Sequence, residues 1–166
     1  MPSPPPSLKG RALRLLSGRE YSRTELERRL KSHEDSPGLL TKALDELQAK
    51  GFIDEQRVLD SVIHRRSAKL GAARIRQELQ NKGLEAEAVK AAISGLQVTE
   101  FERAQAIWRK KFGASVATGD SRPTVSIAER GRQMRFLMSR GFGADTIRRV
   151  IAVGSGEQQT TFETLE

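Results

Sequence analysis

The sequence predicts an all-α protein: a tandem array of three three-helix repeats, elongated and curved. Three observations predict this class. Apolar residues recur at spacings of three and four, as on helix faces, and the alternation typical of strands is absent. A composition that is 37% apolar and 30% charged is lean for one thick core and fits thin stacked modules. The segment 70–96 also matches two other parts of the chain, which indicates an internal repeat.

The first repeat is expected at 8–50, after a disordered proline-serine leader at 1–7. An amphipathic helix over 8–17 ends at Gly18. A second helix over 23–31 begins with Ser22 and Glu25, the spacing of a capping box, and Tyr21 is placed to pack on Leu26. A third helix starts at Pro37 and stops at Gly51.

The second repeat is expected at 51–97. Asp54 is a candidate N-cap for a helix that runs to Lys69. Two shorter helices follow, joined by a turn at Gly83, where a helix end favours a left-handed residue. Ile75 and Leu79 match Leu26 and Leu30 in the first repeat.

The third repeat is expected at 98–153, followed by a disordered acidic tail at 154–166. Its first helix carries an aromatic stripe that we interpret as core packing, and a polar loop at 113–124 follows. A helix over about 125–140 then ends at Gly141, and the last helix is expected at 144–153. The residues expected to point inward from the helix at 125–140 are Ile127, Met134, Leu137 and Met138.

The net charge of +8, with its largest excess in 98–153, indicates a polyanionic partner such as nucleic acid. A surface that is basic only for solubility is the alternative. The chain has no cysteine, no apolar run long enough to span a membrane and no secretory h-region at its start. We therefore expect an intracellular, cytoplasmic protein.

Motifs for catalysis are missing from the sequence. His33 and His64 fall in different repeats, without metal-ligand spacing, and no phosphate loop, dinucleotide motif or nucleophile elbow occurs. Carboxylates lie at helix starts or among arginines and lysines on solvated faces. We expect no enzyme activity, no catalytic residue, no metal and no cofactor.

Seven short motifs follow one another in order along the chain: Ala12-Leu13-Arg14-Leu15-Leu16, Tyr21-Ser22-Arg23-Thr24-Glu25-Leu26, Gly51-Phe52-Ile53-Asp54-Glu55, Arg74-Ile75-Arg76-Gln77-Glu78-Leu79, Lys82-Gly83, Arg135-Phe136-Leu137 and Arg140-Gly141-Phe142. This ordered set resembles the RecX family of regulatory proteins, and the resemblance extends from residue 8 to about residue 153. Two departures are Val58-Leu59, where the family usually has Phe-Ala, and Lys69-Leu70-Gly71-Ala72, where it has Gly-Tyr-Gly-Pro.

The resemblance implies a protein that binds in the groove of the RecA–DNA filament. It further implies inhibition of RecA recombinase, ATPase and coprotease activity, and thereby modulation of DNA repair, recombination and the SOS response. The implied partners are the RecA filament and single-stranded DNA, with double-stranded DNA as a further expectation; no membrane is involved, and a monomer is expected. Ten basic residues are expected to dock electrostatically, with a solvated helix face as the alternative for each: Arg65, Arg66, Lys69, Arg74, Arg76, Lys82, Arg130, Arg132, Arg135 and Arg140.

Two other functions stay open at this point. The first is a direct DNA-binding regulator of helix-turn-helix type, whose recognition helix would read base edges in the major groove. The candidate helices are rich in Arg and Glu and lack a clear Asn and Gln reading set. The second is a scaffold whose charge serves solubility alone.

Overall fold

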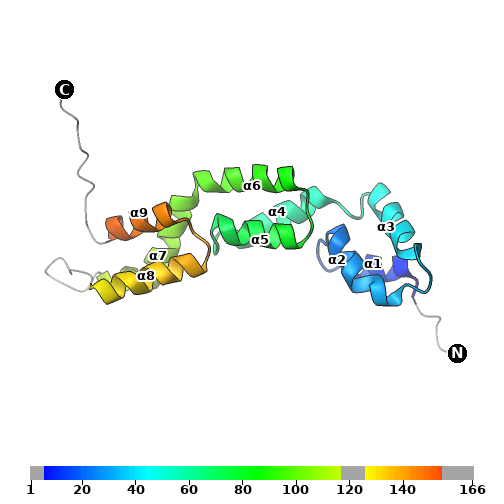
Figure 1. Cartoon of the computed structure of the whole chain (residues 1–166), viewed down its shortest axis with the longest axis horizontal. Coiled ribbons are helices and arrows are strands. Elements are labelled where there is room, and N and C mark those ends of the chain that lie inside the picture. The colour runs from blue at the N-terminus through cyan, green and yellow to red at the C-terminus, as the bar shows by residue number, and fades with distance from the viewer. Residues whose placement is uncertain (1–5, 117–125, 155–166) are drawn as a thin grey trace, which may run out of the picture. The chain divides into compact units, whose positions relative to one another are not determined.

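The computed structural model describes residues 6–116 and 126–154, with side chains placed up to residue 113 in the first range. Within these ranges the regular structure is helical and contains no strand, which confirms the predicted all-α class (Figure 1). The polar loop predicted at 113–124 is wrong for its first four residues, because α7 continues through 113–116. The expectations for most of the leader, for residues 117–124 of that loop and for the tail beyond residue 154 lie outside the described residues.

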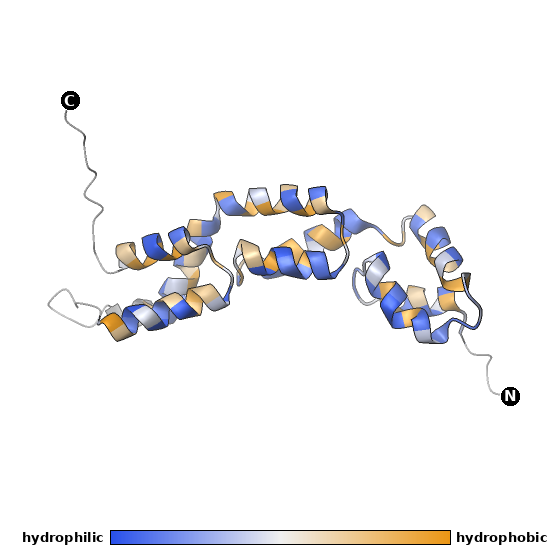
Figure 2. Cartoon of the chain, in the orientation of Figure 1, coloured by the Kyte–Doolittle hydropathy of each residue, from blue (hydrophilic) through white to orange (hydrophobic). Residues whose placement is uncertain are grey.

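The described helices follow the predicted order, three to a repeat. Figure 2 shows that hydrophilic and hydrophobic residues are mixed along the helices, as expected for thin modules. The helices are α1 (Leu8–Leu16), α2 (Arg23–Leu30), η1 (Lys31–His33), α3 (Leu39–Ala49), α4 (Glu55–Arg66), α5 (Ala72–Asn81), α6 (Ala86–Val98), α7 (Glu100–Val116), α8 (Ile127–Ser139) and α9 (Ala144–Gly154).

The chain divides into two compact units. The N-terminal unit comprises Met1–Arg65 and Gln77–Lys90, and the C-terminal unit comprises Arg66–Arg76 and Ala91–Glu166. Both units draw on the second repeat, so the repeat borders at 8–50, 51–97 and 98–153 remain a proposal.

The core of the N-terminal unit is formed by α1, α2 and α3, with Leu26, Leu44 and Leu47 fully buried. The predicted capping box is confirmed: Ser22 Oγ accepts from the Glu25 N–H at 3.2 Å, and Glu25 Oε2 accepts from the Ser22 N–H at 3.0 Å. The start predicted for α3 at Pro37 is wrong, because the helix begins after Gly38, whose φ is +88°.

The core of the C-terminal unit is formed by α7, α8 and α9. Trp108 and Phe112 are buried against α8 and α9, which confirms that the aromatic stripe is core packing. The Trp108 indole N–H donates to the Gln133 side-chain oxygen at 3.0 Å, so the one buried amide of α8 is satisfied.

Three of the inward positions predicted for α8 are wrong. Ile127, Met134 and Met138 are 91%, 39% and 63% exposed. The buried face instead carries Gln133 and Leu137, which are one helical turn apart. Because Met134 and Met138 each follow a buried residue by one position, about 100° of rotation carries them away from the core.

The helix predicted to reach Lys69 ends earlier, at Arg66. The N–H groups of Lys69 and Leu70 both donate to the Arg66 carbonyl at 2.9 Å, which closes the helix with a tight turn. The carbonyls of Ser67 and Leu70 accept hydrogen bonds from Arg103 of α7, so this segment is ordered although it is not helical.

A joint within the N-terminal unit connects the first repeat to the turn after α5. Ser22 Oγ donates to the Lys82 carbonyl at 2.5 Å, and Gly83, with φ +71°, lies directly against Thr24. Glu25 accepts from Lys82 Nζ at 2.8 Å and from Arg19 Nη2 at 2.9 Å. Burial alone would raise the pKa of Glu25, but these hydrogen bonds outweigh it and lower the pKa from 4.5 to about 2.

An equivalent joint within the C-terminal unit connects the start of α5 to the turn after α8. The Gly71 N–H donates to the Arg140 carbonyl at 2.8 Å, and the Ala73 N–H donates to the Gly141 carbonyl at 3.2 Å. A Cβ on Gly71 would overlap the backbone of Gly141 and Phe142, so Gly71, directly before α5, permits the close approach of the two backbones. The two joints share one arrangement. In the first, the turn at Gly83 lies against the start of α2; in the second, the turn at Gly141 lies against the start of α5.

Candidate interaction site

A pocket of about 360 Å³ in the C-terminal unit gathers basic side chains around one aromatic ring. The segment after α4, the end of α7 and the last turns of α8 contribute to it. Its lining consists of Ala68, Lys69, Ile107, Lys110, Lys111, Phe136 and Arg140. Four of these seven residues are cationic, which makes the pocket a candidate site for an anion.

The aromatic ring is held in place by its neighbours. Phe136 meets Phe112 edge to face, with ring centroids 5.3 Å apart and an interplanar angle of 89°. The Arg140 guanidinium lies 4.6 Å from the Phe136 centroid, within cation–π range. Arg140 Nη1 also donates to the Lys69 carbonyl at 3.1 Å, so the guanidinium is ordered at two points.

Arg103 positions the segment that carries Lys69. Its guanidinium donates to the carbonyls of Ser67 at 2.9 Å, Leu70 at 2.8 Å and Leu96 at 3.0 Å. Burial lowers the pKa of Arg103 from its ordinary value, while the neighbouring Glu100 favours the charged form. Glu100 in turn accepts from the Ala72 N–H at 3.1 Å and from the Thr146 hydroxyl at 3.0 Å. These two residues fix the geometry of the pocket wall.

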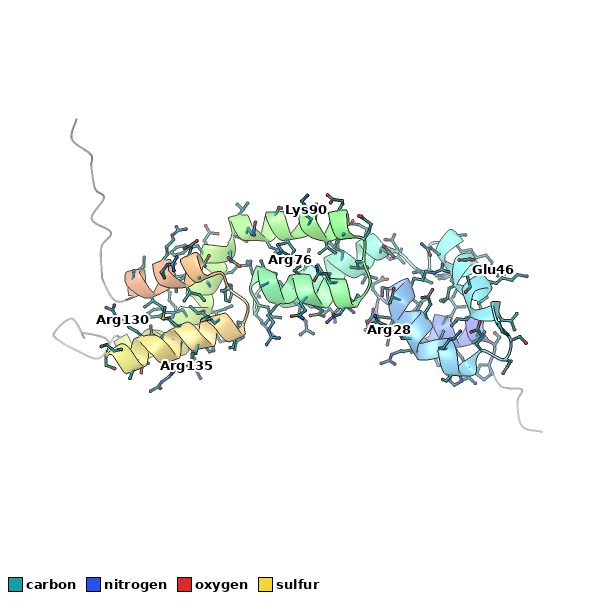
Figure 3. All side chains as sticks on the ribbon, in the orientation of Figure 1. Arg28, Glu46, Arg76, Lys90, Arg130 and Arg135 are labelled. Atoms are coloured by element: carbon teal, nitrogen blue, oxygen red, sulfur yellow. The ribbon has the colours of Figure 1, made fainter. Side chains whose placement is uncertain are left out.

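The structure brings together two of the predicted docking residues, Lys69 and Arg140, at the pocket. Arg66, Arg74 and Arg76 are also exposed in the C-terminal unit. Arg74 Nε donates to the Ser139 carbonyl at 3.2 Å, so this arginine also stabilises the joint at Gly141. Arg76 is labelled in Figure 3 and offers an exposed cation.

Three further predicted residues lie on α8. Figure 3 shows Arg135 on the side of α8 turned away from α9. Arg132 forms an exposed ion pair with Glu129 at 3.2 Å, which leaves its guanidinium accessible. Arg130 is half-buried on the first turns of the same helix.

The remaining two predicted residues, Arg65 and Lys82, belong to the N-terminal unit. Arg65 is exposed at the end of α4, with Nε donating to the Ser61 carbonyl at 3.1 Å. Lys82 is only 9% exposed and pairs with Glu25. A buried cation that already has a carboxylate partner is poorly placed to dock a ligand. We therefore assign Lys82 to the joint and leave it out of the proposed surface.

Sequence reasoning missed five of the seven pocket residues, Ala68 among them, and the arginine behind the pocket, Arg103. Lys110 and Lys111 stand out in the sequence as a basic cluster, but α7 continues past them to Val116, and nothing local connects them to Lys69. Ile107 and Phe136 follow the apolar period of their helices and look like ordinary core residues. Arg103 carries no local signal at all, because its partners lie far away in the sequence.

An aromatic ring among cations is a combination that binds single-stranded nucleic acid, because bases stack on rings and phosphates pair with lysine and arginine. Among the described residues, no group of three His, Asp or Glu side chains could hold a metal ion. None of the helices in the described ranges is long and apolar enough to cross a membrane.

Fold and pocket together define a helical-repeat protein with a pocket lined by cationic side chains. Models of the second and third three-helix domains of RecX match residues 54–93 and 99–151. The regulatory protein RecX of Leptothrix cholodnii is 46% identical over 151 residues, or 91% of each chain. That of Ralstonia pickettii is 40% identical over 92% of this chain and 91% of its own. The chain therefore belongs to the RecX family of regulatory proteins.

Solved structures agree with the fold. A crystal structure of RecX from Lactobacillus salivarius superposes with a TM-score of 0.68 at 18% identity, covering 88% of this chain and 93% of its own. The described helices of this chain therefore follow an architecture already seen in the family.

Proposed function

We propose that this protein binds in the groove of the RecA–DNA filament and inhibits the recombinase, ATPase and coprotease activities of RecA. It thereby modulates DNA repair, recombination and the SOS response, acting in the cytoplasm as a monomer. Membership of the RecX family of regulatory proteins is the observation that carries this proposal. The cationic pocket supports it, because a filament of protein on DNA offers both phosphates and acidic side chains.

The contacts of the proposed surface divide into two kinds. Lys110 and Lys111 are exposed and reach the pocket from α7, which suits electrostatic contact with phosphates. Phe136 is half-buried and offers part of its ring to a base. Arg76 and Arg135 are exposed outside the pocket and suit acidic side chains of the filament.

Titration of this protein into RecA assembled on single-stranded DNA tests the proposal, with ATP hydrolysis as the readout. The wild-type chain should slow hydrolysis at near-equal or lower amounts than RecA. The double variant Lys110→Gln/Lys111→Gln should raise the concentration for half-maximal inhibition about tenfold, which corresponds to ~1.4 kcal/mol of lost docking energy. To test the exposed arginines outside the pocket, Arg76→Glu is preferred to a substitution of Arg74. The reason is that Arg74 Nε also donates to the Ser139 carbonyl and so stabilises the joint at Gly141.

A matched control is available in Lys42→Gln/Lys50→Gln. Both lysines are exposed on or next to α3, outside the pocket, and the net charge changes equally. Unchanged ATP hydrolysis with wild-type protein at low salt would refute the proposal. Tight binding to one duplex sequence without RecA, surviving competitor DNA, is instead the result expected of a helix-turn-helix regulator.

A further inference from the structure

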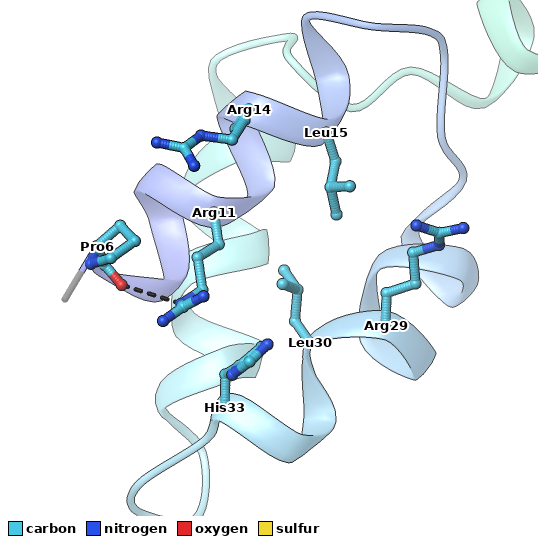
Figure 4. A pocket seen from close by; sticks show the side chains of 7 residues that line it. All are labelled: Pro6, Arg11, Arg14, Leu15, Arg29, Leu30 and His33. Atoms are coloured by element: carbon cyan, nitrogen blue, oxygen red, sulfur yellow. Dashed lines mark hydrogen bonds between the residues drawn. The ribbon is translucent and has the colours of Figure 1, made fainter.

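A second cationic cavity, of about 270 Å³, lies in the N-terminal unit and has no role in the proposed contacts with RecA (Figure 4). Helix α1 contributes Arg11, Arg14 and Leu15 to its lining, and α2 contributes Arg29 and Leu30. The residue before the N-cap of α1, Pro6, and the last residue of η1, His33, complete it.

The arginines of this cavity differ from Arg19, Arg23 and Arg57 of the same unit, which pair with carboxylates. Arg23 pairs with Asp45 at 2.7 Å and with Glu27 at 3.0 Å, and Arg57 pairs with Glu20 at 3.1 Å. In the part of the chain that the structure describes, no acidic side chain pairs with any arginine of the cavity. Uncompensated guanidinium groups around a cavity are suited to an external anion.

One of these arginines is preorganised. Arg11 is half-buried, and its Nε donates to the Pro6 carbonyl at 3.1 Å, which directs the guanidinium along the cavity wall. Arg29 is exposed, with its guanidinium 5.5 Å from the Tyr21 ring centroid. The two cations are therefore supported independently, one by a backbone carbonyl and one beside an aromatic ring.

The apolar part of the cavity lies between the cations. Figure 4 shows Leu15 and Leu30 pointing toward one another, with Arg11 and His33 on one side and Arg29 on the other. A free phosphate is small and would meet only one of these sides. A ligand that satisfies the whole cavity carries an apolar body between two anions.

We propose that this cavity binds single-stranded nucleic acid, with one nucleoside over the half-buried Leu15 and its flanking phosphodiesters on Arg11 and Arg29. Phosphodiesters are charged at every pH of interest and recur at each nucleotide, so any strand presents the required pattern. An acidic peptide presents this pattern only where an apolar residue lies between two correctly spaced carboxylates. The site rests on the DNA-binding part of the proposed function and extends it to the first repeat.

Fluorescence anisotropy of a labelled oligothymidylate, titrated with the full chain at several salt concentrations and without RecA, tests the site. Each phosphate contact to a single strand contributes roughly −0.7 to the slope of log affinity against log salt. Arg11→Gln/Arg29→Gln should therefore reduce the magnitude of the slope by about 1.4, which corresponds to two contacts. Arg29→Gln alone should reduce it by about 0.7. Within the described part of the chain, the Arg29 side chain lies beside the Tyr21 ring and is exposed, so this variant is the less disruptive of the two. Lys42→Gln/Lys50→Gln should leave the slope unchanged.

Three results would overturn the proposal. Slopes of the arginine variants equal to that of the lysine control would remove the cavity from DNA binding. The second result is that wild type and Arg29→Gln give the same slope in sodium phosphate at matched ionic strength. That result would assign the cavity to free phosphate. The third result is that the two give the same slope with a Glu-Leu-Glu peptide, which would assign the cavity to acidic peptides.

Parallel measurement of RecA ATP hydrolysis separates this site from the proposed function. If the wild-type chain inhibits RecA but the arginine variants give the same slope as the lysine control, the cavity proposal is refuted and the proposed function stands. A wild-type chain that neither inhibits RecA nor binds the oligonucleotide refutes both.

Discussion

Gly83 ends α5 with φ +71° and lies against Thr24, so its replacement by alanine tests the joint in the N-terminal unit. Two physical costs add. A residue with a Cβ in the left-handed region costs about 1–2 kcal/mol. The new Cβ would also lie 2.9 Å from Thr24 Cβ and 3.1 Å from Thr24 Cγ2, and such overpacking costs about 1–3 kcal/mol.

The unfolded chain offsets part of this cost, because alanine has less conformational freedom than glycine, by about 0.4–1 kcal/mol. We therefore expect Gly83→Ala to lower the free energy of unfolding by about 2–4 kcal/mol. Urea unfolding followed by circular dichroism measures this change.

Gly51→Ala is the matched control within the same unit. Gly51 has a similar φ of +74°, but no atom lies within 4 Å of the position that its Cβ would take. This variant should carry the backbone cost alone, about 1 kcal/mol after the same offset. The difference between the two variants isolates the contact with Thr24.

A double variant completes the test. Thr24→Ala removes the hydroxyl and Cγ2 that crowd the new Cβ, so Gly83→Ala should cost less in this background, with a coupling of about 0.5–3 kcal/mol. Equal losses for Gly83→Ala and Gly51→Ala would refute the steric reasoning. So would additivity of Gly83→Ala and Thr24→Ala.

Three further predictions concern Glu25 in the same joint, and Gly71 and Arg103 in the C-terminal unit. Glu25 has a folded-state pKa of about 2, below its ordinary 4.5, so the free energy that its charge contributes to folding is fully present above pH 4.5 and is lost as the pH falls toward 2. The difference in free energy of unfolding between wild type and Glu25→Gln, measured in urea, should therefore shrink over that range. Gly71→Ala should destabilise by ~3 kcal/mol or more in thermal unfolding, because its Cβ meets the backbone at Gly141. Arg103→Met should lose about 2–4 kcal/mol in urea unfolding, because three carbonyls lose their donor, whereas the exposed Arg135→Met should lose under ~0.5 kcal/mol.

The fold was largely predictable because the signals that start and end these helices are local. The capping box at Ser22 and the left-handed glycines at 83 and 141 act within a few residues. The spacing of Leu26 and Leu30 selects one buried face without reference to the rest of the chain. The errors on α8 arose where a buried glutamine, Gln133, occupied a core position that an apolar pattern does not reveal.

The site was predictable only in part. Basic character near Lys69 and Arg140 follows from composition, but their meeting with Lys110, Lys111 and Phe136 requires the packing of α7 and α8 on the segment after α4. Lys82 shows the converse case, since its sequence neighbours suggest an exposed helix end, whereas the side chain is buried and its partner, Glu25, belongs to another repeat.

By itself, the sequence determined the helical class, the turn positions, the basic charge and the resemblance to a family, because each depends on residue type and short-range spacing. The tertiary structure alone decided which cations line a pocket and which pair with a carboxylate inside a joint. That division depends on contacts such as Arg103 with Ser67 and Leu70, or Gly71 with the turn at Gly141. Such contacts join residues far apart in the chain, and local propensity carries no information about them.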